Sequence, residues 1–217
     1  MGNPVNRPIQ SKKRYVISFI IGTVIFIAVL LLGYYLSYIE FFRVSQAQTD
    51  LAYTIFEDKL YFNLFNQSYC SNTSYSKVSE DLGFQGRIID DLEKKFGKNH
   101  EGVLLRKKFY TLVELEHFEF VKNMNKQCKT NVSTIFFFYS NEKDDLGNGE
   151  ELGKLLGVVY SKHPNLVIYS FDINLKSELI RKLKEKYKID GPNILIVNDN
   201  FKLINPQNIK EIEVYLP

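Results

Sequence analysis

The chain has 217 residues, enough for one ordinary domain or two small ones, and 45% of them are apolar and 14% aromatic. This composition is ample for a folded core and excludes an intrinsically disordered chain. The net charge is +3, and the first fourteen residues hold four cations and no acidic residue. The rest of the chain is close to neutral, which gives no reason to expect a nucleic-acid partner, since such a partner would call for a basic face.

The first predicted element is a transmembrane helix over residues 15–39, which contain no charged side chain. A helix needs about 20 apolar residues to cross the hydrocarbon of a bilayer, and this run is longer. Tyr15 at one end and Tyr38 at the other suit the two membrane interfaces. The alternative is a buried core helix, but a soluble domain of this size rarely encloses so long an uncharged segment. We therefore expect residues 15–39 to contact membrane lipid.

The orientation follows from the flanking charges. The basic tail of residues 1–14 precedes the apolar run, whereas only Arg43 follows it closely, beside Glu40. The positive-inside rule then predicts a cytoplasmic N-terminus and an extracytoplasmic C-terminal part, in a single-pass protein of the cell membrane. The alternative is a cleaved signal peptide, with residues 45–47 as a small-x-small site. The apolar run is longer than a signal core and Ala47 lies far past it, which favours an uncleaved signal anchor.

Residues 40–130 are predicted to form a helical bundle or spacer. No Gly or Pro occurs between Tyr34 and Asp81, so the membrane helix is expected to continue through Leu51 and Ile55 until a polar stretch around Cys70. Two further helices are expected, each with one apolar face. Those faces are Val78, Leu82, Ile89, Leu92 and Phe96 in the second helix, which ends at Gly97, and Leu105, Phe109, Leu112, Phe120 and Met124 in the third.

The two cysteines of the chain, Cys70 and Cys128, both follow the membrane segment. Thiols outside the cytoplasm tend to be oxidised, so an even count predicts one disulfide, and two unpaired thiols are the alternative. If the three helices run out, back and out, the first and third end at the same edge, and each is followed by one cysteine. The cysteine spacing is not that of a zinc site and His100, His117 and His163 are scattered, so we expect no metal and no other cofactor.

Three sequons lie on the predicted outer side, at Asn66, Asn72 and Asn131. They permit glycosylation where the host has the machinery, but such short patterns also arise by chance.

From residue 131 the pattern changes to alternating strands and helices. Strands are predicted at 133–140, 165–174, 191–199 and 201–205, with helices at 149–163, 175–189 and 208–215. The order βαβαββα predicts an α/β fold with a central sheet, whose first two strands are parallel because a helix crosses between them and whose last two form a hairpin.

The segments "TIFFFYSN", "VIYSFDIN" and "LKEKYKIDGPNILIVND" resemble the thioredoxin-like superfamily. In particular, the chain is similar to small prokaryotic membrane-anchored thioredoxin-like proteins of unknown role, in which a helical spacer precedes this domain. The resemblance covers residues 131–217. It implies that Pro192, between Gly191 and Asn193, is in the cis form and borders a groove that faces the redox position. The alternative is an ordinary turn proline, since Gly-Pro favours turns.

The chain departs from that family at the redox position itself. The place of the Cys-x-x-Cys motif is taken by Leu146, Gly147, Asn148 and Gly149, none of which supplies the thiolate that the reaction requires. The acidic residues Glu142, Asp144 and Asp145 just before it lack the order of a calcium loop and are interpreted as a solvated loop. No nucleophile and base occur in a known catalytic pattern.

These observations predict a redox-inactive thioredoxin-like domain rather than an enzyme. It would serve as a binding or structural module, either holding an extended peptide in the groove near Pro192 or contacting another membrane protein. The alternative is a thiol-disulfide oxidoreductase or isomerase that uses Cys70 and Cys128. Against it stand the long separation of the two cysteines and their distance in sequence from Pro192.

Overall fold

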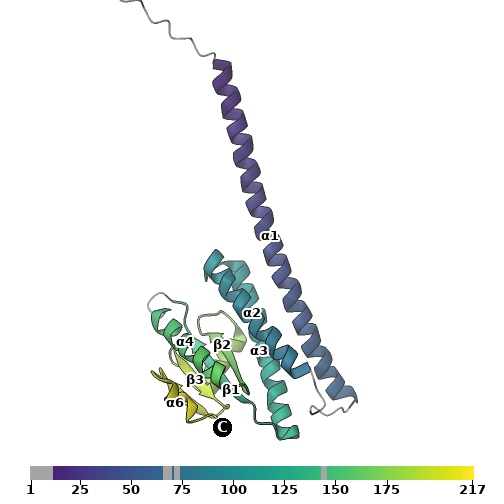
Figure 1. The fold of residues 1–217 in the computed structure, drawn as a ribbon, viewed down its shortest axis with the longest axis vertical. Helices are drawn as coiled ribbons and strands as arrows, with labels where there is room; N and C mark the ends of the chain where they lie inside the picture. The colour runs from purple at the N-terminus through teal and green to yellow at the C-terminus, as the bar shows by residue number, and fades with distance from the viewer. Residues whose placement is uncertain (1–11, 66–69, 71–73, 143–145) are drawn as a thin grey trace, which may run out of the picture. The chain divides into compact units, whose positions relative to one another are not determined.

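The computed structural model describes residues 12–65, 70, 74–142 and 146–217. Their order matches the predicted succession of three helices and an alternating α/β part (Figure 1). In chain order, the elements are α1 Lys12–Phe65, α2 Ser74–Phe96, α3 Glu101–Cys128, β1 Ser133–Tyr139, α4 Leu146–Lys162, β2 Leu166–Asp172, α5 Glu178–Tyr187, β3 Ile194–Val197, β4 Phe201–Ile204 and α6 Ile209–Glu213.

Helix α1 carries the predicted membrane segment and continues well past it, as the absence of Gly and Pro after Tyr34 suggested. Among the described residues, its part Lys12–Glu57 is the one stretch long and apolar enough to cross a membrane. The side chains of residues 15–36 are exposed, although most are large and apolar. Residues 45–47, the alternative cleavage site, lie within this continuous helix.

The four strands form one mixed sheet in the order β2-β1-β3-β4. Strands β1 and β2 are parallel, with Ser133 opposite Leu166, and β3 and β4 form an antiparallel hairpin, with Val197 opposite Phe201. Both pairings were predicted from the order of the elements. The hairpin loop has three residues, Asn198, Asp199 and Asn200, and the first two adopt left-handed conformations.

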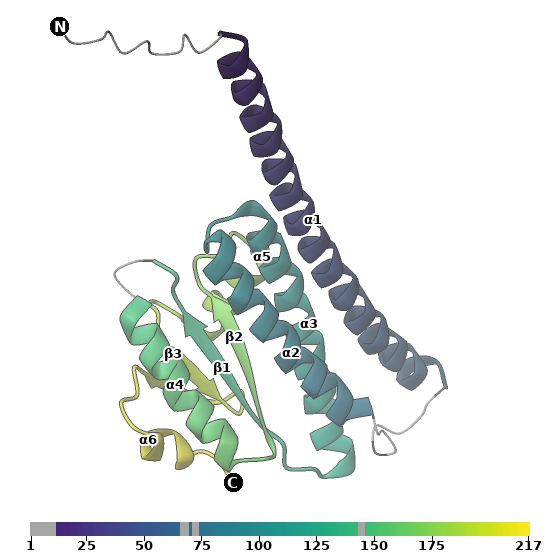
Figure 2. The same cartoon turned by 45° about the horizontal axis from the view of Figure 1, so that its top comes forward.

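Apolar side chains on the two faces of the sheet build two cores. Leu152 and Val159 of α4 and Ile212 of α6 pack on one face, against Ile135 and Leu195. The other face packs against α5 and against helices α1, α2 and α3, around a cluster of aromatic rings. Figure 2 shows α4 across one side of the sheet and α5 on the other. The rings of that cluster are Phe118, Phe136, Phe138, Tyr169, Phe171 and Tyr187.

The helical segment and the sheet are not separate bodies, contrary to the expected division at residue 130. Leu51 and Ile55 of α1, Leu82 of α2 and Val113 of α3 belong to the same core as Phe136 of β1. One compact unit therefore runs from Ser45 to Pro217. The sequence suggested a spacer because the helical and α/β patterns meet abruptly at residue 131. Three helices alone bury little apolar surface, however, and they gain a core by packing on the sheet.

The apolar face predicted for α2 agrees with the observed burial better than the face predicted for α3 does. Val78, Leu82, Ile89 and Leu92 of α2 are buried as expected. In α3 the prediction was wrong for Leu105 and Leu112, which are exposed, and right for Met124, which is buried. The buried face of α3 is instead partly polar, and it consists of Val103, Lys107, Thr111, Val113, Glu114, His117, Phe118, Val121 and Met124.

The predicted disulfide is present between Cys70 and Cys128, whose Cα atoms lie 5.2 Å apart. Since Cys128 is the last residue of α3 and Cys70 follows α1, the bond ties the distal ends of these two helices. No free cysteine is left in the chain, because these two are the only ones in the sequence.

Candidate functional site

The start of α4 and the approach to β3 come together, as the resemblance implied. A Cβ atom built on Gly149 would lie 3.6 Å from Oδ1 of Asn193, so these two residues are in direct contact. Asn193 is buried, and its Oδ1 has no hydrogen-bond partner. Leu146, Gly147 and Asn148 occupy the first turn of α4. The residues predicted to stand at the redox position therefore lie at the start of α4, and Gly149 among them lies close to Asn193.

The expected cis form of Pro192 is not found. Among the described residues no peptide bond is cis, so the bond between Gly191 and Pro192 is trans. The chain turns into β3 through Asn193 instead, whose φ of 59° is left-handed, a conformation that Asn adopts more readily than most residues. The trans form is also the favoured state of an X–Pro bond. The groove argument that rested on a cis proline therefore has no support.

The acidic residues before α4 and the three sequons are only partly described by the structure. Asp144 and Asp145 lie outside the described residues, as do the sequons at Asn66 and Asn72. Glu142 is exposed and accepts a hydrogen bond from Asn174 at 2.9 Å. Asn131 is exposed between α3 and β1.

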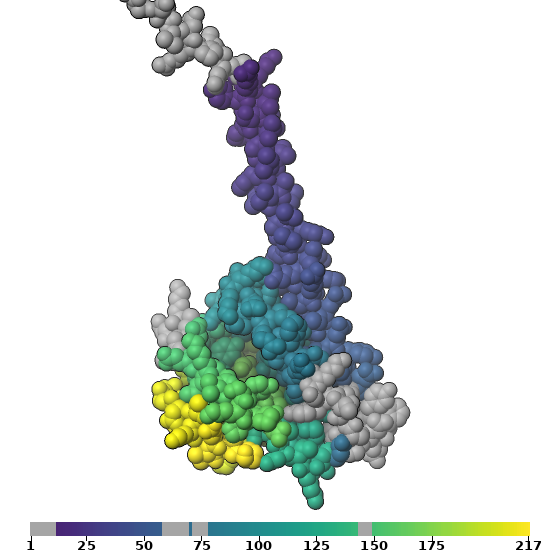
Figure 3. All heavy atoms as spheres, viewed as in Figure 1, coloured from purple at the N-terminus to yellow at the C-terminus, as the bar shows by residue number. Residues whose placement is uncertain are grey.

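A polar cavity of about 320 Å³ lies between α2, α3 and the carboxyl ends of β1 and β2. Gly149 and Glu150 at the start of α4 form part of its wall. In Figure 3, atoms of α2 and α4 cover much of the sheet on the face turned to the viewer. Crevices at the carboxyl ends of parallel strands are the usual location of ligand sites in α/β sheets, and the volume is near the lower end of the range for small-molecule pockets.

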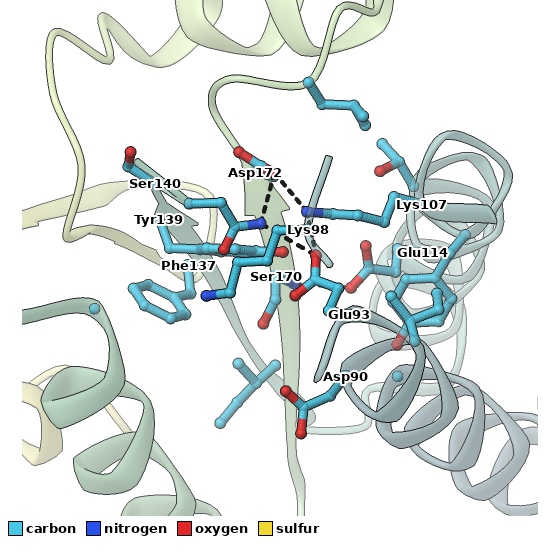
Figure 4. A pocket seen from close by; sticks show the side chains of 18 of the residues that line it. Asp90, Glu93, Lys98, Lys107, Glu114, Phe137, Tyr139, Ser140, Ser170 and Asp172 are labelled. Carbon is cyan, nitrogen blue, oxygen red and sulfur yellow. Dashed lines mark hydrogen bonds and ion pairs between the residues drawn. The ribbon is translucent and has the colours of Figure 1, made fainter. Parts of the chain in front are cut away.

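Lys107 is the centre of a buried ion cluster in this cavity. Its Nζ lies 2.7 Å from Oε1 of Glu93 and 2.5 Å from Oδ2 of Asp172. Asn141 donates from Nδ2 to the same two oxygens, at 3.1 and 2.9 Å. The lysine ammonium also lies 5.4 Å from the centre of the Tyr139 ring. Figure 4 shows these side chains converging from α2, α3, β1 and β2, so the cluster ties the helices to the sheet.

Glu114 is a second buried carboxyl group beside this cluster, and only one of its oxygens is bonded. Oε1 accepts a hydrogen bond from the backbone N–H of Ser170 at 2.8 Å, whereas Oε2 has no partner. The side chain is 1% exposed, and burial raises its pKa well above the usual value. Because Ser170 is in β2, an outer strand of the sheet, Glu114 also covers an N–H at that edge.

The close approach of Tyr110 explains the glycine at position 86 of α2. A Cβ atom on Gly86 would lie 2.9 Å from the hydroxyl oxygen of Tyr110, which is closer than packing allows. The Tyr110 hydroxyl donates to the carbonyl of Leu82 at 3.0 Å, so the ring is held against α2. Glycine at position 86 lowers the helix propensity of α2, but its lack of a side chain permits the close approach of α2 and α3 at the cavity.

A second buried polar group joins α2, α3 and β2 at His117. Its Nε2 lies 3.1 Å from Oγ of Ser79, and its Nδ1 lies 2.9 Å from the hydroxyl of Tyr169. Sequence reasoning found no nucleophile near a base, yet the fold brings this serine and histidine together. The histidine is fully buried, and burial lowers its pKa to about 4. The group therefore acts as a neutral hydrogen-bonded link between the three elements.

We expect the stability of the chain to depend on pH through His117. The folded state holds this ring neutral down to pH of about 4, whereas in the unfolded chain it gains a proton below about 6.5. Between these values the unfolded state binds more protons, so the free energy of unfolding falls as the pH falls. The loss over the whole window is about 3 kcal/mol.

Chemical denaturation between pH 7 and 4 measures this effect, with His117→Gln as the variant that removes it. His100→Gln, at an exposed histidine, is the matched control, and its free energy of unfolding should depend on pH as that of the wild type does. If the free energy of unfolding depends on pH equally in the wild type and in His117→Gln, the pH dependence does not come from His117.

The cavity cannot be found from sequence pattern alone, because its polar groups lie at positions 93, 107, 114, 141 and 172. The one available signal was in α3, where Lys107 and Glu114 lie seven residues apart between Val103 and Val121 on one helical face. Within the described residues, no group of three or more His, Cys, Asp or Glu side chains is placed to hold a metal ion.

Comparisons of the chain with protein-family models, curated proteins and solved structures found no match.

Proposed function

We propose that this chain is a single-pass membrane protein whose outer part is a thioredoxin-like binding module without redox activity. The membrane helix is residues 15–39, the tail before it is cytoplasmic, and the compact unit Ser45–Pro217 is extracytoplasmic. Its partner is a peptide or another membrane protein.

The membrane anchor is supported by the composition and length of the helix Lys12–Glu57. The extracytoplasmic placement is supported by the four cations that precede the apolar run and by the Cys70–Cys128 disulfide, since such bonds persist mainly outside the cytoplasm. The thioredoxin-like assignment is supported by the order of the elements from β1 to α6, with a parallel first pair and a final hairpin.

The observation that carries the proposal is the absence of thiols where the reaction would occur. The first turn of α4 begins at Leu146 and contains no cysteine, and both cysteines of the chain are bonded to each other beyond the ends of α1 and α3. Thiol–disulfide exchange needs a thiolate and a resolving thiol.

A binding role is supported by the difference between the two edges of the sheet. At the β2 edge, Glu114 of α3 occupies the N–H of Ser170. At the opposite edge, β4 pairs with β3 alone among the described strands, and its residues Phe201 and Ile204 are exposed. An extended peptide can add to such an open edge as a further strand, with apolar side chains on both faces to contact it.

We expect the chain to be inactive in an insulin-reduction assay. With dithiothreitol as reductant, the rate should equal that of the reductant alone, because no thiol pair occupies the start of α4. The double variant Cys70→Ser with Cys128→Ser is the matched control and should give the same rate. Turnover by the wild type that the double variant loses would instead establish the oxidoreductase alternative.

We expect the C-terminal part of the chain to be accessible from outside the cell. A protease added to intact cells or spheroplasts should remove a tag placed after Pro217 and spare a tag placed before Met1, because the flanking cations hold the N-terminus inside. Lysed cells, in which both tags are cut, are the control. Protection of the C-terminal tag together with loss of the N-terminal one would overturn the proposed orientation.

A further inference from the structure

The walls of the polar cavity carry more acidic than basic side chains. Two of the acids are exposed at its rim, and the other three are buried. The acidic residues are Asp90, Glu93, Glu114, Glu150 and Asp172, and the basic ones are Lys98 and Lys107. Even with Glu114 protonated, the cavity therefore carries a negative charge.

The buried cation of the cavity is already engaged. Lys107 is held by Glu93 and Asp172, which are its ion-pair partners at 2.7 and 2.5 Å. Glu114 lines the same cavity and its Oε2 has no partner, and Figure 4 shows the Glu114 carboxyl directed from α3 toward Glu93 and Ser170. A buried polar atom without a partner is costly, by about 1–3 kcal/mol, so the site lacks one hydrogen-bonding group.

We propose that this cavity binds a small organic cation, whose ammonium or guanidinium group is held between the carboxylates of Glu93 and Glu114. An approaching cation shifts Glu114 toward its ionised form, because an opposite charge favours the ionised carboxyl group. The resulting pair is a charge-assisted hydrogen bond, which is stronger than a neutral one.

The remaining walls suit such a ligand. Tyr110, Phe137 and Tyr139 line the cavity, and aromatic rings favour organic cations. Glu150 at the rim attracts cations toward the opening, whereas Asp90 is already paired with Lys94 at 2.5 Å. The acidic excess disfavours an anion, and the described residues place no metal-binding group there.

Calorimetric titration of the full-length chain in non-ionic detergent tests this proposal. The probes are putrescine and agmatine, and 1,4-butanediol is the neutral analogue of putrescine with the same carbon chain. We expect saturable binding of both cations and none of the diol. Glu114→Gln keeps the shape of the side chain but cannot ionise, and it should weaken cation binding by roughly ten-fold or more.

Glu119→Gln is the matched control, since it makes the same change at an exposed position of α3, outside the cavity lining, and it should bind as the wild type does. The comparison with the diol uses only the wild-type chain, so it stands even where a variant fails to fold. Failure of both cations to bind, equal binding of the diol, or equal affinities of the two variants would overturn the proposal. Binding of the peptide Ala-Lys-Ala without binding of either free cation would also overturn it and assign the cavity to a basic side chain of a protein partner.

Discussion

Replacing Cys128 with serine is expected to lower the midpoint of thermal unfolding by about 10 °C. The disulfide with Cys70 spans 58 residues and links the ends of α1 and α3. Closing a loop of this length in the unfolded chain corresponds to about 4 kcal/mol in the loop-entropy relation. The effect is large because the helices share their core with the sheet, so loss of the bond weakens the packing of the whole unit Ser45–Pro217.

Differential scanning calorimetry of the wild type and the variant measures the shift, and circular dichroism at low temperature checks that the strands persist. The sheet should survive, since the bond lies before Ser133, where β1 begins. The double variant with Cys70→Ser is the control and should match the single one, because both remove the same bond. Two free thiols in the non-reduced wild type, or a bond between two chains, would contradict the arrangement of α1 and α3.

The order of the elements and the disulfide were predictable because they depend on local rules. Helical periodicity located the buried face of α2, Gly97 ended that helix with a φ of 92°, and the succession of strands and helices fixed which strands are parallel. The disulfide followed from an even cysteine count and the alternation of three helices. Each of these inferences uses only neighbouring residues or the direction of the chain.

The shared core and the cavity were not predictable because they arise from packing between distant segments. In α3 the apolar residues Leu105 and Leu112 indicated the wrong face, since the true one buries Lys107 and Glu114. Charged residues are rarely buried unless paired, so a pattern search assigns them to the surface. Their partners, Asp172 and Ser170, belong to β2, and nothing in the local sequence of α3 indicates that strand.

A loss of stability similar in size to that of Cys128→Ser is expected for Lys107→Met. Methionine has a similar length and fits the same space, but it leaves Glu93 and Asp172 facing each other without the ammonium group between them. Both carboxylates are almost fully buried, with side chains 9% and 4% exposed. Removal of one partner from a buried ion cluster costs about 3–5 kcal/mol, because the remaining charges lose their compensation. Asn141 still donates to both oxygens, but a neutral amide supplies no charge.

Urea denaturation of the full chain in detergent measures the loss, and two comparisons assign it to charge. Lys108→Met makes the same change at the next, exposed position of α3 and should alter the free energy of unfolding by less than about 0.5 kcal/mol. Adding Glu93→Gln and Asp172→Asn to Lys107→Met should restore much of the stability, because the triple variant buries no unpaired charge. If the triple variant is no more stable than Lys107→Met alone, the loss comes from packing around the lysine chain, and the ion cluster does not join the helices to the sheet in the way described.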